Sequence, residues 1–175
     1  HTVEVVAYAA GMASPQLAVP VHRAGTILRR SALNPHPSLA KPLHDLLLAR
    51  TALRAARPMR PELLHAHNFE GLAVGLWLRR RTGLPVVYHQ HNLLEPELPT
   101  YFRFPPLRWA GRGLGRWADH ALPARADACI VLHPEAASYL QACGVQEARL
   151  HVVPPGIELQ PSTKASPRRC APAMA

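Results

Sequence analysis

Four histidines in two His-x-His pairs are the residues whose types and spacing most directly suggest chemistry. His65 and His67 lie in ELLHAHN, and His89 and His91 lie in PVVYHQHN. Residues two apart on a β-strand point to the same side of a sheet, so each pair can present two imidazoles together. Two adjacent strands would then gather four imidazoles, an arrangement suited to a metal-dependent hydrolase.

Neither pair comes with the rest of a metal-ligand set, because no carboxylate stands at a clear ligand spacing from the histidines. We therefore favour a simpler interpretation, in which one histidine of each pair is buried against a helix and the other faces a cleft. On this interpretation the sequence contains no metal site and requires no cofactor.

The second histidine pair ends an apolar run and begins a polar one. Pro85–Tyr88 is β-branched and aromatic, which predicts a buried strand. Ligands bind at the carboxyl ends of the strands in open α/β sheets. His91 and Asn92, followed by Glu95 and Glu97, therefore form a candidate site. The alternative is a polar loop that only covers the end of the sheet.

Alternating strands and helices would position this site. Strands are predicted at Val3–Tyr8, Val19–His22, Glu62–Asn68, Pro85–Tyr88, Ala126–Leu132 and Leu150–Val153, and helices at Leu39–Ala56, Phe69–Thr82, Leu107–Leu122 and Glu135–Ala142. Residues 92–106 are rich in proline and are predicted to form a loop. The alternation predicts a Rossmann-like α/β fold, with a parallel sheet and helices on both faces.

The length of 175 residues fits one domain, which we assign to residues 1–158. Residues 159–175 contain mainly Pro, Ser, Thr, Ala and Arg without periodicity, and are predicted to be a disordered tail. The chain begins at His1 directly before a strand, so we expect a piece of a longer protein.

The net charge of +9 suggests an anionic partner. Nucleic acid is not favoured, because no DNA- or RNA-binding motif accompanies the charge. Three cysteines without a pairing pattern indicate a reducing compartment. No signal peptide or membrane-spanning stretch is recognisable, so the expected location is the cytoplasm.

Residues 103–125 combine many arginines with Phe104, Trp109 and Trp117. Basic and aromatic side chains together suit a helix at an anionic membrane surface, here the inner face of the cell membrane. The alternative is an ordinary helix whose tryptophans belong to the core. The GxGxG in RWAGRGLGRW follows no strand, so we do not assign it to nucleotide binding.

Three segments carry a resemblance to a known family: ELLHAHNFEGLAVGLWLRRRTGLPVVYHQHNLLEPELPTYF, RADACIVLHPEAASYLQACGV and RLHVVPPGIE. Together they resemble the N-terminal domain of family 4 (group 1) retaining glycosyltransferases, from about His1 to Glu158. The strand-end His67, the His91-Asn92 step and the PPGI turn occur in the expected order. The resemblance implies one half of a GT-B architecture of two Rossmann-like domains.

The resemblance also implies a function: a nucleotide-sugar donor passes its sugar to a glycan or lipid-linked acceptor with retention of configuration. His91 would be the catalytic residue, contacting a hydroxyl of the transferred sugar and binding no metal. The implied substrate-binding residues are those at or just after the strand ends: His67, Asn68, Asn92, Glu95, Glu97 and Tyr101.

The sequence departs from the family at both ends. The family's first strand and glycine-rich loop would precede His1, and its donor-binding second domain would begin after Glu158, where residues 159–175 look unrelated. These departures imply a chain that is truncated at both ends, or frameshifted at its end. Such a chain would bind donor mostly through the missing domain and would be inactive alone. A second hypothesis is a non-catalytic remnant that binds glycan or anionic lipid, and a third is the metal-dependent hydrolase.

Overall fold

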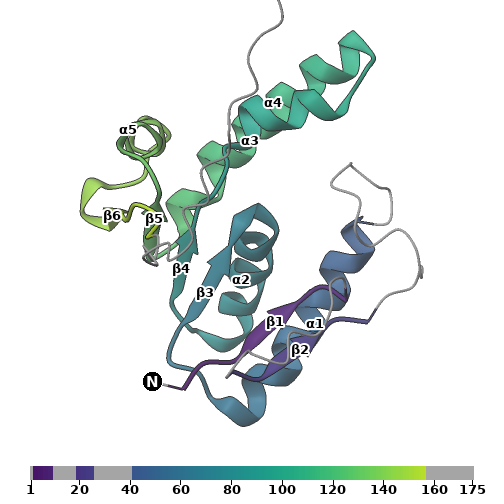
Figure 1. Ribbon diagram of the computed structural model, residues 1–175, viewed down its shortest axis with the longest axis vertical. Helices are drawn as coiled ribbons and strands as arrows, with labels where there is room; N and C mark the ends of the chain where they lie inside the picture. The colour runs from purple at the N-terminus through teal and green to yellow at the C-terminus, as the bar shows by residue number, and fades with distance from the viewer. Residues whose placement is uncertain (1, 10–18, 26–40, 157–175) are drawn as a thin grey trace, which may run out of the picture.

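The computed structural model describes residues 2–9, 19–25 and 41–156, except for the side chain of Lys41. Within them the strands are β1 (Val5–Ala7), β2 (Val21–Arg23), β3 (Leu64–His67), β4 (Val86–His89), β5 (Ala128–Val131) and β6 (Leu150–Val152). All paired strands run parallel, in a two-stranded sheet of β1 and β2 and a four-stranded sheet in the order β3-β4-β5-β6 (Figure 1). The predicted parallel α/β architecture is confirmed, and the predicted tail lies outside the described residues.

The helices are α1 (Lys41–Met59), α2 (Asn68–Thr82), α3 (Leu94–Glu97), α4 (Pro105–Ala121) and α5 (Pro134–Ala142), with 3-10 turns at Leu98–Tyr101, Pro123–Arg125 and Glu147–Arg149. In the part of the chain described, none of them is both long and apolar enough to cross a membrane. Gly83 ends α2 as its position predicts, because it adopts a φ of 73° and its N–H donates to the carbonyl of Arg79.

The prediction of a loop over residues 92–106 is wrong, since this segment contains α3 and a 3-10 turn. Both oxygens of the Asp119 carboxylate accept hydrogen bonds at the start of α3, from the N–H of Leu94 at 3.2 Å and of Glu95 at 2.9 Å. A cap supplied from a distant helix leaves no signal in the local sequence.

One face of the four-stranded sheet forms the main core. Ala66, Val86, Tyr88 and Cys129 point to that face and pack against Leu72 of α2 and Leu140 of α5. The residues that alternate with them on β3 and β4 are half-buried or exposed: His65, His67, Val87 and His89. The described helices α2 and α5 pack on the first face through Leu72 and Leu140.

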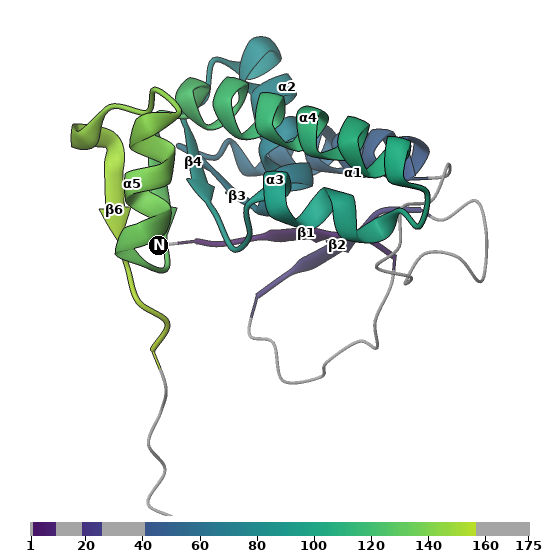
Figure 2. The same ribbon diagram turned by 90° about the horizontal axis from the view of Figure 1, so that it is seen from above.

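A second apolar cluster joins the smaller sheet to the rest of the molecule. Leu48 and Ala49 of α1 pack against Val74 and Leu78 of α2, and Val6 of β1 lies against the same cluster. Figure 2 shows α1 and α2 on one side of the strands. Among the described residues no backbone hydrogen bond links β1 to β3, so the two sheets meet through α1 and not through strand pairing.

Helix α4 projects away from the sheet and packs on α3 (Figure 1). Gly115 faces α3 so closely that a Cβ there would lie 2.5 Å from the Leu94 carbonyl oxygen. The glycines of RWAGRGLGRW lie within a helix, so they form no phosphate-binding turn. The alternative in which the tryptophans of this segment belong to the core is wrong, because Trp109 is 83% and Trp117 59% exposed.

Candidate functional site

A cleft of about 740 Å³ opens at the carboxyl ends of β4 and β5. Residues that follow these two strands line it: Gln90, His91, Asn92, Leu93, Pro96 and Glu97 after β4, and Leu132, His133, Glu135, Ala136 and Tyr139 after β5. The predicted site residues His91, Asn92 and Glu97 are thereby brought together. Leu93, Pro96, Leu132 and Ala136 form an apolar part of the wall, and the other seven lining residues carry polar groups.

Gln90 is the most buried polar residue of the cleft, with 3% of its surface exposed. Its backbone N–H donates to the carbonyl of Ile130 at 2.9 Å, which fixes the end of β4 against β5. Its side-chain Nε2 donates weakly, at 3.5 Å, to the carbonyl of Asn92. Its Oε1 is buried and accepts no hydrogen bond from the described residues, so a rotation of the side chain toward the cleft would let it accept one from a ligand.

The two predicted carboxylates are held by tyrosines in different ways. The Tyr139 hydroxyl donates to Glu95 at 2.6 Å, which draws that carboxylate toward α5, and Glu95 is not among the residues lining the cleft. Glu97 lines the cleft and accepts a hydrogen bond from the Tyr101 hydroxyl. That hydrogen bond, together with burial, raises the pKa of Tyr101 to about 12, so Tyr101 stays a donor at neutral pH.

His67 and Asn68 lie at the carboxyl end of the neighbouring strand β3, outside the cleft lining. Asn68 begins α2 with a φ of 58°, a left-handed conformation that asparagine tolerates better than most residues. His67 connects to the cleft through His91, since its Nδ1 lies 3.2 Å from Nε2 of His91. The site is therefore continuous from β3 to β5.

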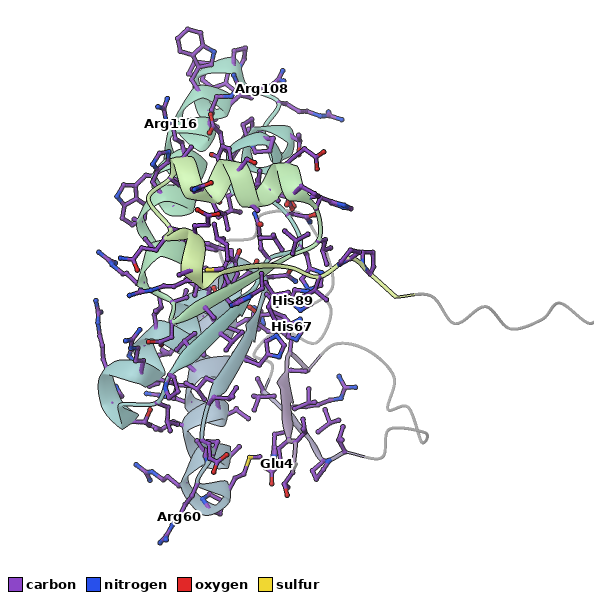
Figure 3. All side chains as sticks on the ribbon, turned by 90° about the vertical axis from the view of Figure 1, so that its left-hand side faces the viewer. Glu4, Arg60, His67, His89, Arg108 and Arg116 are labelled. Atoms are coloured by element: carbon purple, nitrogen blue, oxygen red, sulfur yellow. The ribbon has the colours of Figure 1, made fainter. Side chains whose placement is uncertain are left out.

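The four histidines of the two pairs form one cluster. β3 and β4 pair in a register that sets His67 opposite His89. Neighbouring rings lie with centroids 4.5 to 5.6 Å apart, and all of these pairs are stacked except His67 with His89, which is tilted. Figure 3 shows His67 and His89 side by side on the sheet. The interpretation that one member of each pair is buried against a helix is wrong, because His65, His67 and His91 are exposed and His89 is only half-buried.

The close packing of the cluster favours the neutral forms of His65, His67 and His89. Burial, followed by the repulsion of neighbouring imidazolium charges, lowers the pKa of His65, His67 and His89 below the usual value. Both ring nitrogens of His89 are shielded from solvent and hydrogen-bond to no described group. The ligand nitrogens of His65, His67 and His89 lie within 4.8 Å of one another, a grouping that fits a metal ion.

Sequence reasoning missed half of the cleft. His133, Glu135 and Tyr139 follow β5 just as His91 and Asn92 follow β4. The same rule about strand ends, applied to the second strand, would have found them. Gln90 was overlooked because a lone glutamine between two histidines carries no distinctive chemistry of its own.

Comparison with known proteins decides the family of this chain. The family model described as Glycosyltransferase Family 4 matches residues 1–161. The chain belongs to glycosyltransferase family 4. The resemblance to this family noted in the sequence is therefore confirmed over residues 1–161.

Two individual proteins resemble this family 4 chain. A D-inositol 3-phosphate glycosyltransferase of Kribbella flavida is 29% identical over 162 residues, which cover 83% of this chain and 36% of the relative. The crystal structure of Anabaena HepE, solved in complex with UDP and glucose, has a TM-score of 0.45 and 18% identity, over 79% of this chain and 32% of HepE. The chain spans about a third of the length of each protein.

Proposed function

We propose that this chain is the acceptor-binding half of a retaining glycosyltransferase that uses a nucleotide-sugar donor. The family match and the cleft at the carboxyl ends of β4 and β5 support this proposal. The donor would be held mostly by a second domain, which accords with a chain that spans only a third of its relatives. The catalytic chamber would then lie between the two domains, with this cleft as one wall.

His91 is the residue to which we assign the reacting sugar. It is exposed at the rim of the cleft, and its ring is oriented by the 3.2 Å contact with His67. An imidazole in this position can hydrogen-bond a sugar hydroxyl and fix the reacting centre, an effect that commonly lowers a barrier by several kcal/mol. Asn92, beside it on the same wall, supplies both a donor and an acceptor for further hydroxyls.

The charge of the cleft favours a neutral, hydroxyl-rich acceptor. Glu97 and Glu135 contribute two carboxylates, and no Lys or Arg is among the described residues that line the cleft. Carboxylates and the free Gln90 oxygen accept hydrogen bonds from hydroxyls, whereas carboxylates repel phosphate. Although the Kribbella relative is named for a phosphorylated polyol, we propose that this cleft takes the sugar end of a glycan or lipid-linked acceptor.

Calorimetry tests this assignment. Neutral oligosaccharides, inositol phosphate, UDP-sugars and GDP-sugars are titrated separately into the chain and into its His91→Ala variant. We expect weak binding of neutral saccharide that His91→Ala reduces by about tenfold, the loss that corresponds to one hydrogen bond of about 1.4 kcal/mol. His151→Ala, an exposed histidine on β6 outside the cleft, is the matched control.

Four outcomes separate the hypotheses. Saccharide binding that depends on His91 supports the acceptor role, and turnover lost in an active enzyme containing His91→Ala supports the catalytic role. Absence of saccharide binding contradicts the proposal. Donor binding by this chain alone would argue against a non-catalytic remnant.

Helix α4 supports a second part of the proposal, namely peripheral association with the inner face of the cytoplasmic membrane. Arg108, Arg112 and Arg116 are four residues apart and exposed, so they form a row along the helix. Leu107, Leu114 and Trp117 form an exposed apolar row beside it. An apolar row flanked by arginines suits an anionic bilayer surface, where a lipid-linked acceptor would be found.

A further inference from the structure

We propose that His65, His67 and His89 form a binding site for one divalent transition-metal ion, with zinc as the best-suited probe. The site lies on the open face of the β3–β4 sheet, beside the cleft. This inference concerns the isolated chain and does not depend on the glycosyltransferase function.

The backbone places the three ligands before any ion arrives. His65 and His67 point the same way from β3, and the parallel register sets His89 of β4 directly opposite His67. Their ligand nitrogens already lie within 4.8 Å of one another. A tetrahedral zinc ion with bonds of about 2.0–2.1 Å sets its ligand nitrogens about 3.3 Å apart, so modest rotations of the side chains complete the geometry.

The free hydrogen-bonding capacity of the cluster indicates a ligand. Both ring nitrogens of His89 are shielded from water and bond to no described group, and an orphaned polar atom of this kind is costly. Coordination would satisfy one of these nitrogens. His65 and His67 are exposed, so an ion can enter from solvent without unfolding the sheet.

His91 completes the arrangement as a positioning residue. Its Nε2 lies 3.2 Å from Nδ1 of His67, a hydrogen bond that can fix the tautomer and orientation of the His67 ring. Histidines that bind metals usually have such a partner on the other nitrogen. Three imidazoles leave the fourth position of a tetrahedral ion open to water or to an exogenous ligand.

The donor set selects the class of metal. Imidazole suits zinc, copper, nickel and cobalt, whereas magnesium and calcium require oxygen ligands. The cluster has only nitrogen donors, so magnesium is the appropriate negative control. The ligand group consists of three imidazoles, and the inference concerns metal binding alone.

Calorimetry of the dilute 175-residue chain with zinc chloride and magnesium chloride tests the proposal. We expect one zinc ion per chain and no magnesium. His65→Gln and His89→Gln should each weaken zinc binding by at least about tenfold, and His91→Gln by about 10- to 100-fold, as is typical for a partner of a ligand. His151→Gln, which removes an exposed histidine from β6, should leave zinc affinity unchanged.

A measurement on the unsubstituted chain keeps the test decisive if a variant does not fold. In ¹⁵N NMR spectra of the histidine rings, zinc should shift resonances of three residues in the cluster and leave His151 unchanged. Zinc should also raise the melting temperature by mass action. Equal weakening by His151→Gln, equal uptake of magnesium, or unchanged ring resonances in the presence of zinc would each overturn the proposal.

Discussion

The Gln90 side chain illustrates how a buried polar residue can serve binding at the expense of stability. Its Oε1 is buried without a partner in the described structure, and this costs folding free energy. We expect Gln90→Met, which keeps the shape and removes the acceptor, to weaken saccharide binding by about 5- to 12-fold, the equivalent of one net hydrogen bond of 1–1.5 kcal/mol. The free energy of unfolding should stay the same or rise.

Calorimetry and urea denaturation of the same variant measure both quantities. Gln146→Met provides the control, because Gln146 is exposed and lies outside the cleft. Unchanged saccharide affinity in Gln90→Met, or a large loss of stability without loss of affinity, would assign Gln90 to structure alone.

At the residue scale, the sequence predicts which side chains follow a strand but not where those side chains turn. His91 and Asn92 could be placed at the cleft because strand ends collect ligand sites. The orientation of Glu95 could not be predicted, because its partner Tyr139 lies 44 residues away. The alternation of side chains along a strand predicts two histidines on one side of each strand. That all four gather in one cluster can be predicted only once β3 is known to pair with β4.

At the element scale, the junction of α3 and α4 depends on one glycine. A Cβ at Gly115 would meet the backbone of Leu94 and Glu95 at 2.5 to 2.8 Å, and backbone cannot move aside cheaply. We expect Gly115→Ala to lower the free energy of unfolding by about 1–3 kcal/mol and to weaken ligand binding in the cleft that α3 borders.

Gly113 is a matched control two residues away in the same helix. A Cβ at Gly113 meets no atom within 4 Å, so Gly113→Ala should raise the free energy of unfolding by about 1 kcal/mol through helix propensity alone. Urea denaturation of both variants checks the pair. Equal effects at the two positions would mean that α4 does not pack on α3 as described.

The exposed face of α4 gives a second prediction at this scale. Arg108 and Arg116 lie along α4, at the opposite end of the molecule from Glu4 and Arg60 (Figure 3). We expect the chain to bind vesicles containing anionic lipid, with an affinity that falls as salt rises. Replacing Trp109 and Trp117 with Ala should weaken this binding further, because both side chains are exposed and available to the interface.

Vesicle co-sedimentation measures this binding. Trp77→Ala is a control that removes a tryptophan whose ring packs against α1 and Arg81 instead of facing solvent. Equal binding to neutral and anionic vesicles, or binding to neither, would remove the membrane assignment.

For the whole molecule, the order and direction of the elements were predictable and the continuity of the sheet was not. Apolar strands alternating with helices led to a parallel α/β fold, and each predicted strand is present in the structure. The same alternation does not specify whether β1 lies next to β3. Whether the strands form one sheet or two depends on tertiary contacts, because a strand joins a sheet only beside a neighbour with a compatible register.

The split leaves two strand edges without partners among the described residues. β1 pairs only with β2, and β3 pairs only with β4. Val3 and Leu63, which border these edges, are 52% and 50% exposed, so the edges present apolar side chains as well as free backbone groups. Unpaired apolar edges promote association between chains.

We therefore expect the 175-residue chain to associate as its concentration rises, and to have little catalytic activity alone. Lysine at an exposed edge opposes strand pairing, so Val3→Lys combined with Leu63→Lys should shift the chain toward monomer. Light scattering coupled to size-exclusion chromatography measures this shift, and Ala148→Lys, in an exposed turn, controls for added charge. The edge variant would also be the suitable background for the stability measurements above. The opposite result would be a chain that is monodisperse at high concentration, with a sharp thermal transition and measurable sugar transfer. That result would contradict the prediction that the two unpaired edges cause association and loss of activity.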